Sequence, residues 1–155
     1  MDQLTVREQN VLLSILVMLI YFTVDNHFDL YPWNNLKEAG SQLGSTLMGW
    51  VPFSALALGV IKKNRMVGYF GFAWAAIWLL LQVRQWWVPY WFGPTIVHAD
   101  FSWYYEHGYT TTQSLLPKLS DRPTPDLQHM VLQGLSFIVL MTFWDHCRGV
   151  EARRG

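Results

Sequence analysis

Four stretches of the chain are apolar for long enough to cross a lipid bilayer. The clearest is residues 66–83, a run of 18 residues with no charged side chain and one amide, Gln82. As a helix this run extends over roughly 27 Å, close to the thickness of the hydrocarbon layer. Basic residues precede it and tryptophans follow it, as is typical of the two ends of a transmembrane helix. The pattern therefore predicts a membrane-spanning helix here.

Three further apolar stretches predict spanning helices over residues 6–27, 40–61 and 125–146. Thr5 and Glu8 form a T-x-x-E capping box, which places the start of the first helix at its predicted position. The first ten residues lack the basic region of a signal peptide, so we expect the first span to be retained.

A segment of different character, residues 84–124, separates the third and fourth spans. It is rich in Trp, Tyr and Phe, which favour the membrane–water interface. Pro89 and Pro94 are expected to break any long helix there. Asp100 is placed to cap a short helix that runs to His107 and is amphipathic enough to lie flat on the membrane. Thr124 and Pro125 then suit the first positions of the fourth span.

Together these features predict one all-α domain over residues 1–155. It is expected to be an integral membrane four-helix bundle with a long, aromatic-rich extracytoplasmic loop that carries short interfacial helices. Charged residues make up 14% of the chain and aromatic residues 16%, whereas soluble chains are about one quarter charged. The formal net charge is zero, which argues against a nucleic-acid partner. Cys147 is the only cysteine, which excludes a disulfide within the chain.

Basic residues favour one side of the predicted bundle. Seven Lys and Arg residues share the side of the termini: Arg7, Lys62, Lys63, Arg65, Arg148, Arg153 and Arg154. Four fall on the other side: Lys37, Arg84, Lys118 and Arg122. Because cytoplasmic loops carry an excess of basic residues, both termini of this multi-pass protein are predicted to be cytoplasmic, with the cell membrane as its location.

Most carboxylates and histidines fall on the opposite, outer side. Asp25, His27 and Asp29 would share one side of an extended segment after the first span, where they could hold a metal or move protons. The alternative is a solvated helix end. No tight ligand motif supports a metal or a haem, and the sequence names no cofactor.

The sidedness leads to a first hypothesis: an outward-facing site, under the aromatic loop, that binds or acts on a lipid-like or amphiphilic small molecule. In an enzyme, a histidine would act as base and a carboxylate would orient it. The candidates for catalysis are His27, Asp25 and His129. The candidates for ligand binding are Glu106, His107, Asp126, Trp103 and Tyr104. The sequence does not decide between binding and catalysis.

The alternative is a non-catalytic accessory or assembly subunit of a membrane complex. Small residues recur at spacing four in the second span, where Gly40 and Gly44 make a G-x-x-x-G motif. Such residues let helices approach closely in lipid, either within one chain or between chains. A homo- or hetero-oligomer would form through Gly44, Ser45 and Gly49. A third hypothesis, a substrate channel, would use hydroxyl and amide groups within the spans, whose usual role is helix–helix hydrogen bonding.

Overall fold

A computed structural model describes residues 3–64 and 66–151, and in this part of the chain all regular structure is helical. Four long helices form the body: α1 (Val6–His27), α3 (Leu43–Ile61), α4 (Met66–Phe92) and α6 (Leu127–Glu151). Two short helices lie in the connections: α2 (Leu36–Ala39) and α5 (Ser102–Glu106). All four long helices are long and apolar enough to cross a membrane, which confirms the all-α prediction and the number of candidate spans.

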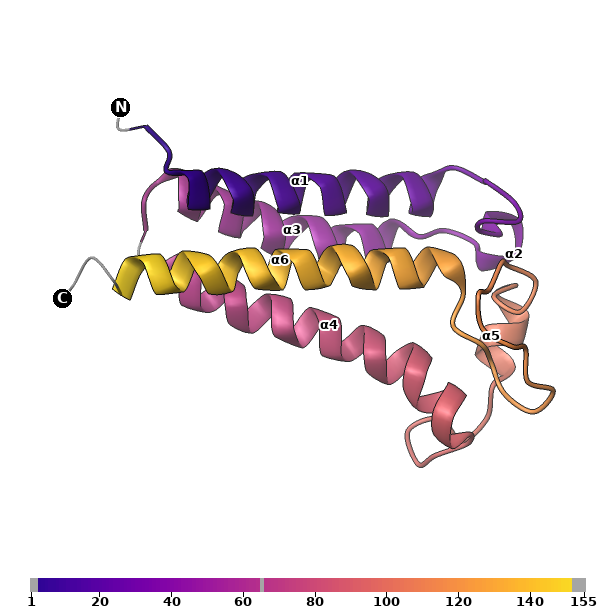
Figure 1. Cartoon of the computed structure of the whole chain (residues 1–155). Helices are drawn as coiled ribbons and strands as arrows, with labels where there is room; N and C mark the ends of the chain where they lie inside the picture. Colours follow the sequence, from indigo (N-terminus) through magenta and orange to yellow (C-terminus); the bar gives the residue numbers. More distant parts are fainter. Residues whose placement is uncertain (1–2, 65, 152–155) are drawn as a thin grey trace.

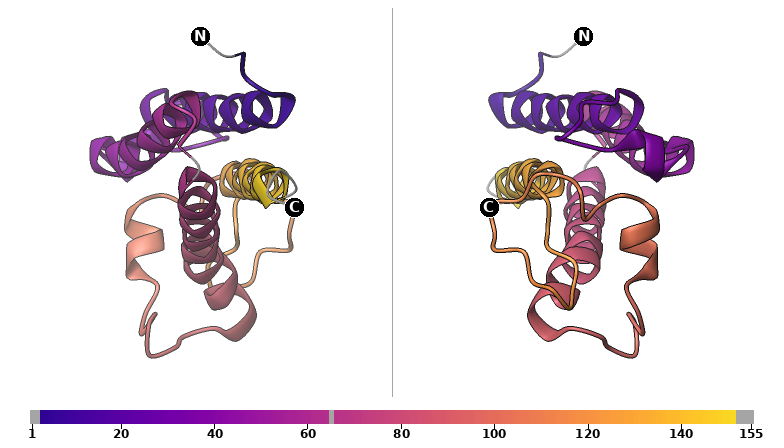
Figure 2. Two further views of the ribbon diagram at one scale, coloured as in Figure 1. Left: turned by 90° about the vertical axis from the view of Figure 1, so that its left-hand side faces the viewer. Right: turned by 90° about the vertical axis from the view of Figure 1, so that its right-hand side faces the viewer.

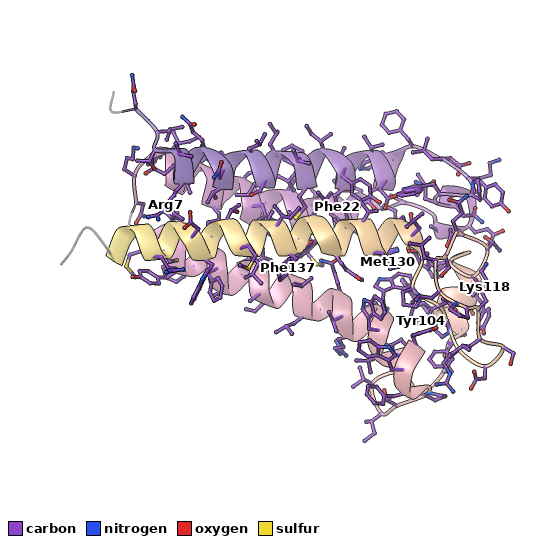
Figure 3. The ribbon with its side chains drawn as sticks, viewed as in Figure 1. Arg7, Phe22, Tyr104, Lys118, Met130 and Phe137 are labelled. Carbon is purple, nitrogen blue, oxygen red and sulfur yellow. The ribbon has the colours of Figure 1, made fainter. Side chains whose placement is uncertain are left out.

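The long helices form two layers, α1 with α3 and α4 with α6 (Figures 1 and 2). Helix α1 packs against α3 and α6, and α4 packs against the same two helices. Helix α4 leans away from α6 toward the end that carries α2 and α5 (Figure 1). Arg7 lies at the opposite end, where α1 begins and α6 ends, far from Tyr104 and Lys118 (Figure 3). We call the end with α2 and α5 the loop end.

The core is apolar and continuous along the bundle. Its buried residues come from all four long helices and include Val11, Ile15, Met18, Phe22, Phe53, Val60, Ala75, Trp78, Val139 and Phe143. Gly49 allows this packing between α1 and α3, because a Cβ atom there would lie 2.8 Å from the Phe22 ring. The outward faces of the helices are also apolar, with exposed Leu16, Val51, Leu80 and Ile138.

Helix α1 begins where the capping box predicts. The Thr5 backbone N–H donates to Glu8 Oε2 at 2.7 Å, and the Glu8 N–H donates back to Thr5 Oγ1 at 3.4 Å. The same Glu8 carboxylate accepts from Lys63 Nζ at 2.6 Å. The cap therefore also ties the start of α1 to the turn between α3 and α4.

Two predicted helix starts are wrong by a few residues. The second span begins at Leu43, not at residue 40, because Gly40 has a φ of +71° and ends α2. Gly40 and Gly44 therefore do not share a helix. The fourth span begins at Leu127, not at 125, because Asp126 is its cap and accepts the His129 backbone N–H at 3.0 Å.

The third helix continues to Phe92, past its predicted end at residue 83 and through Pro89. A proline inside a helix leaves the carbonyl four residues earlier without its N–H partner, and that carbonyl belongs to Gln85. The Tyr104 hydroxyl, from α5, donates to the Gln85 carbonyl oxygen. Tyr104 is buried against Trp86 and Phe101. Burial raises the pKa of Tyr104, so the hydroxyl keeps the proton that it donates. The predicted break at Pro89 is therefore absent, because the loop replaces the lost hydrogen bond.

We expect Tyr104→Phe to destabilise the protein by about 1–3 kcal/mol, since it removes the partner of the Gln85 carbonyl while keeping the ring. The free energy of unfolding of the purified protein in detergent measures this. Tyr105→Phe is the matched control, because Tyr105 follows in the same helix and is 50% exposed. Equal effects of the two substitutions would show that the Tyr104 hydroxyl does not support α4.

Candidate functional site

A cavity of about 380 Å³ opens between the long helices at the loop end. This loop-end cavity is apolar on its inner side, where Phe22 and Leu132 line it. Polar side chains follow about one helical turn nearer the loop end, among them Asp25 in α1 and His129 in α6. Its volume falls within the range of about 300–1,000 Å³ that is usual for small-molecule sites. The cavity is therefore amphipathic along its depth.

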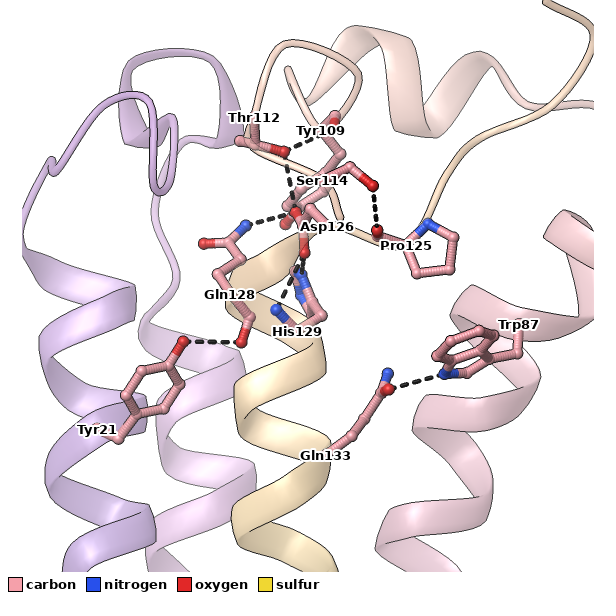
Figure 4. A network of polar contacts seen from close by, with 10 residues as sticks. All are labelled: Tyr21, Trp87, Tyr109, Thr112, Ser114, Pro125, Asp126, Gln128, His129 and Gln133. Atoms are coloured by element: carbon pink, nitrogen blue, oxygen red, sulfur yellow. Dashed lines mark hydrogen bonds and ion pairs between the residues drawn. The ribbon is translucent and has the colours of Figure 1, made fainter. Parts of the chain in front are cut away.

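A carboxylate and an imidazole form a close pair at the start of α6 (Figure 4). Asp126 Oδ1 lies 2.6 Å from His129 Nδ1, and the carboxylate is 1% exposed. Its other oxygen accepts from Gln128 Nε2 at 2.8 Å and lies 3.1 Å from the Thr112 hydroxyl. Buried carboxylates are tolerated when their oxygens are satisfied in this way. Asp126 thus caps the helix and holds the imidazole at the same time.

The His129 ring is held on its other sides by aromatic groups. It lies over the Trp86 indole with ring centres 3.9 Å apart and meets the Tyr109 ring edge to face at 5.5 Å. Burial, followed by the nearby Asp126 and Asp25 charges, raises the pKa of Tyr109 to about 12, so this phenol is neutral. A carboxylate accepts only, so the hydrogen bond to Asp126 requires a proton on Nδ1, and a ring with its one proton there has Nε2 as an acceptor. Such an imidazole can serve as a general base.

Hydrogen bonds along α6 connect the pair to the rest of the bundle. The Tyr21 hydroxyl of α1 donates to the Gln128 carbonyl at 2.7 Å (Figure 4). Trp87 Nε1 of α4 donates to Gln133 Oε1 at 2.7 Å, one turn deeper than His129. The start of α6 is therefore fixed to both neighbouring helices.

Asp25 also lines the cavity, and it is 7% exposed. Within the described residues, its Oδ1 atom has no hydrogen-bond partner. Asn34 holds the backbone at this point, because its amide donates to the carbonyls of Asp25 at 2.7 Å and Phe28 at 2.8 Å. The predicted candidates Asp25, Asp126 and His129 are therefore brought to one region.

His27 does not join them. Helix α1 continues through His27, so this ring faces α3 and its Nε2 lies 3.0 Å from Thr46 Oγ1. Asp29 lies 3.8 Å from Lys37 Nζ instead. The extended Asp25–His27–Asp29 cluster is therefore absent. The described part of the chain holds no group of three or more His, Cys, Asp and Glu side chains placed to bind a metal ion.

The predicted loop residues have different surroundings. Trp103 lines the cavity and is 41% exposed. His107 stacks on Trp103 at 4.8 Å, outside the cavity lining, and Glu106 is exposed on α5. Tyr104 lies behind them, on the Gln85 carbonyl. Of the loop candidates, Trp103 is the one that reaches the cavity.

Sequence reasoning missed most of the polar lining. Gln82 and Gln85 of α4 and Gln128 of α6 face the cavity, as does Trp86. For Gln82, the sequence signal is its position as the one amide in an apolar run. The others lie in polar segments, where an amide carries no pattern of its own.

We expect Asp126→Asn to destabilise the protein by about 3 kcal/mol, because the amide nitrogen would face hydrogen-bond donors in a buried place. Thermal or chemical unfolding of the purified protein measures this. Asp121→Asn is the control: Asp121 lies in the same loop, exposed and paired with Arg122, and should change stability very little. Comparable losses for both would contradict a structural role of the Asp126 carboxylate.

Comparison with known proteins yields no relative that bears on function. The carboxylates, the imidazole and the amides of the loop-end cavity are thus the observations that bear on function. No known protein family, curated protein or solved structure matches this chain.

Proposed function

We propose that this is a multi-pass membrane protein whose loop-end cavity binds or acts on a lipid-like or amphiphilic small molecule. The single observation that carries the proposal is the cavity itself, apolar at its inner side and polar toward the loop end. A ligand that matches this gradient has an alkyl chain and a polar head. The four long helices have the length and composition of membrane spans, and their outward apolar faces suit lipid better than water.

The lining residues support entry of such a ligand from the side. Met48 of α3 and Leu81 of α4 both line the cavity and both are largely exposed on the helix surface. In a bilayer these surfaces would meet lipid chains. An alkyl chain would thus pass from the membrane to the inner part of the cavity without crossing water, which avoids the cost of hydrating it.

The chemistry of the polar end fits proton transfer or hydrogen bonding to a hydroxyl. His129 Nε2 would accept a hydrogen bond, or a proton, from a ligand hydroxyl. Asp126 would keep the ring in the required tautomer and stabilise the imidazolium. Binding alone uses the same geometry.

We place the loop end outside the cytoplasm. Of the described basic residues, Arg7, Lys62, Lys63 and Arg148 lie at the opposite end. Arg65, Arg153 and Arg154, which complete the bias of seven to four, lie outside the described residues, as does Asp2. The positive-inside rule then puts both termini in the cytoplasm and the loop, with its short helices, at the outer interface.

Cysteine labelling tests this orientation. In a Cys147→Ser background, Ser120→Cys should react with a membrane-impermeant maleimide on intact cells, because Ser120 is exposed at the loop end. Asn64→Cys, in the exposed turn between α3 and α4, should react only after permeabilisation. The reverse pattern would invert the orientation, and labelling of both on intact cells would rule out the four spans.

A binding experiment tests the site. 1-Decanol, which carries the chain and one hydroxyl, should raise the unfolding temperature of the amphipol-held protein. His129→Asn keeps an N–H near the position of Nδ1 but lacks Nε2, so it should weaken decanol binding about tenfold. His27→Asn is the matched control at the same end of the bundle and should bind as the wild type does. No shift by decanol, or equal loss in both variants, would refute the proposed site.

The accessory-subunit hypothesis is the second candidate. Gly44 and Ser45 are exposed on α3, with open space around Gly44, which suits contact with another chain. Gly49 faces Phe22 inside the bundle, so it would take no direct part in such a contact. The decanol experiment separates the two hypotheses, since a scaffold needs no ligand.

A further inference from the structure

We infer that the head group taken by the loop-end cavity is uncharged and rich in hydroxyls, as in an alkyl glycoside, and is neither a phosphate nor an amine. The inference rests on the proposed function and concerns the kind of amphiphile. It is based on the charges around the cavity, on three polar atoms without partners, and on the residue types of the polar lining.

The charges disfavour a phosphate. Among the described residues that line the cavity, Arg84 carries the one permanent positive charge, and its side chain is exposed. Asp25 lines the same space, and the Asp126 carboxylate lies directly behind His129. A phosphate would have to approach both carboxylates in surroundings of reduced dielectric constant, where like charges repel more strongly than in water. Phosphate sites instead gather several Arg, Lys or backbone N–H groups.

Three buried polar atoms lack a hydrogen-bond partner, and a ligand can complete their bonds only when the side chains that carry them turn toward the cavity. They belong to Asp25, Trp78 and Gln82, which all line the cavity. Within the described residues, Asp25 Oδ1 and Gln82 Oε1 are acceptors without a donor, and Trp78 Nε1 is a donor without an acceptor. Each such group costs free energy until it is satisfied. A ligand that satisfies all three atoms must both donate and accept hydrogen bonds.

The unpartnered oxygen of Gln82 does not result from the choice of orientation for its amide group. Its Nε2 donates to Ser136 Oγ at 3.0 Å and to the Trp78 carbonyl at 3.4 Å. Both hydrogens of the amide nitrogen are thus used, and the oxygen is the atom left over. Only a donor can satisfy it.

Among common head groups, hydroxyls meet these demands best. A hydroxyl can donate to Asp25 or Gln82 and accept from Trp78. An ionised phosphate has no donor for Asp25 or Gln82. An ammonium group, although the carboxylates attract it, has no acceptor for Trp78 Nε1. Seven of the lining side chains are carboxamides, so most of the polar lining carries no charge. Trp103 adds an exposed indole at the same cavity, and its electron-rich face suits the C–H face of a sugar ring.

Three probes with the same chain test the inference: decyl glucoside, decyl phosphate and decylamine, each added below its micelle concentration. Their affinities for the full-length, amphipol-held protein are measured from the shift of the unfolding temperature. We expect decyl glucoside to bind at least about tenfold more tightly than either charged probe. One or two additional hydrogen bonds would produce a gain of this size.

Gln82→Met assigns the preference to this cavity. It keeps the length of the side chain but removes the acceptor, so the glucoside should lose about fivefold in affinity while decyl phosphate is unchanged. Gln133→Met is the control, because Gln133 is a buried amide of α6 that does not line the cavity. It should leave the order of the three probes unchanged.

The outcomes are distinct. Equal or tighter binding of decyl phosphate or decylamine overturns the inference and leaves the amphiphile site in place. A glucoside preference that persists in Gln82→Met removes the assignment to the cavity amide. If neither decanol nor any decyl probe binds, the proposed function fails together with the inference.

Discussion

One hydrogen bond, from the Tyr104 hydroxyl to the Gln85 carbonyl, lets α4 continue past Pro89. Without it the helix would present an unsatisfied carbonyl at the point where a proline has removed the normal partner. The same contact fixes α5 to α4 and buries Trp86 between Tyr104 and Tyr109. Trp86 in turn forms the surface on which His129 lies. The position of the candidate base thus depends on how the loop satisfies one backbone group.

Asp126 has a comparable double role at the start of α6. Its carboxylate satisfies a backbone N–H that every helix start leaves open, and it also accepts from the imidazole three residues later. Since the cap and the pair use the same side chain, the orientation of His129 is as firm as the helix start itself. Such coupling suits a site, because an imidazole on a rigid element keeps its geometry better than one on a free loop.

The parts of the fold that depend on local chemistry could be predicted from the sequence. The capping box at Thr5 and Glu8 gave the start of α1, and apolar runs of membrane length gave the four long helices. The extension of α4 could not be predicted, because it depends on Tyr104, which lies 19 residues after Gln85 in the chain. The late start of α3, at Leu43, follows from the positive φ of Gly40, of which the helical spacing of small residues gives no sign.

The same contrast between local pattern and distant contacts explains why only part of the site was predicted. His27 and His129 both stand near outer helix ends, and only the packing of α1 on α3 turns His27 toward Thr46. Asp25, two residues earlier, lies on the opposite face of the helix and reaches the cavity, as the helical period of about 3.6 residues requires. The cavity amides come from three helices and from the connection between α1 and α3, and no single stretch of sequence could have grouped them.

The stacking of His129 on Trp86 has a consequence for any proton that the imidazole takes up. The face of an indole is electron-rich and attracts a cation placed over it. A protonated His129 would therefore meet negative potential from two directions, from Asp126 in the plane of the ring and from the indole below it. The site could thus keep a positive charge inside the protein without a counter-ion from the solvent.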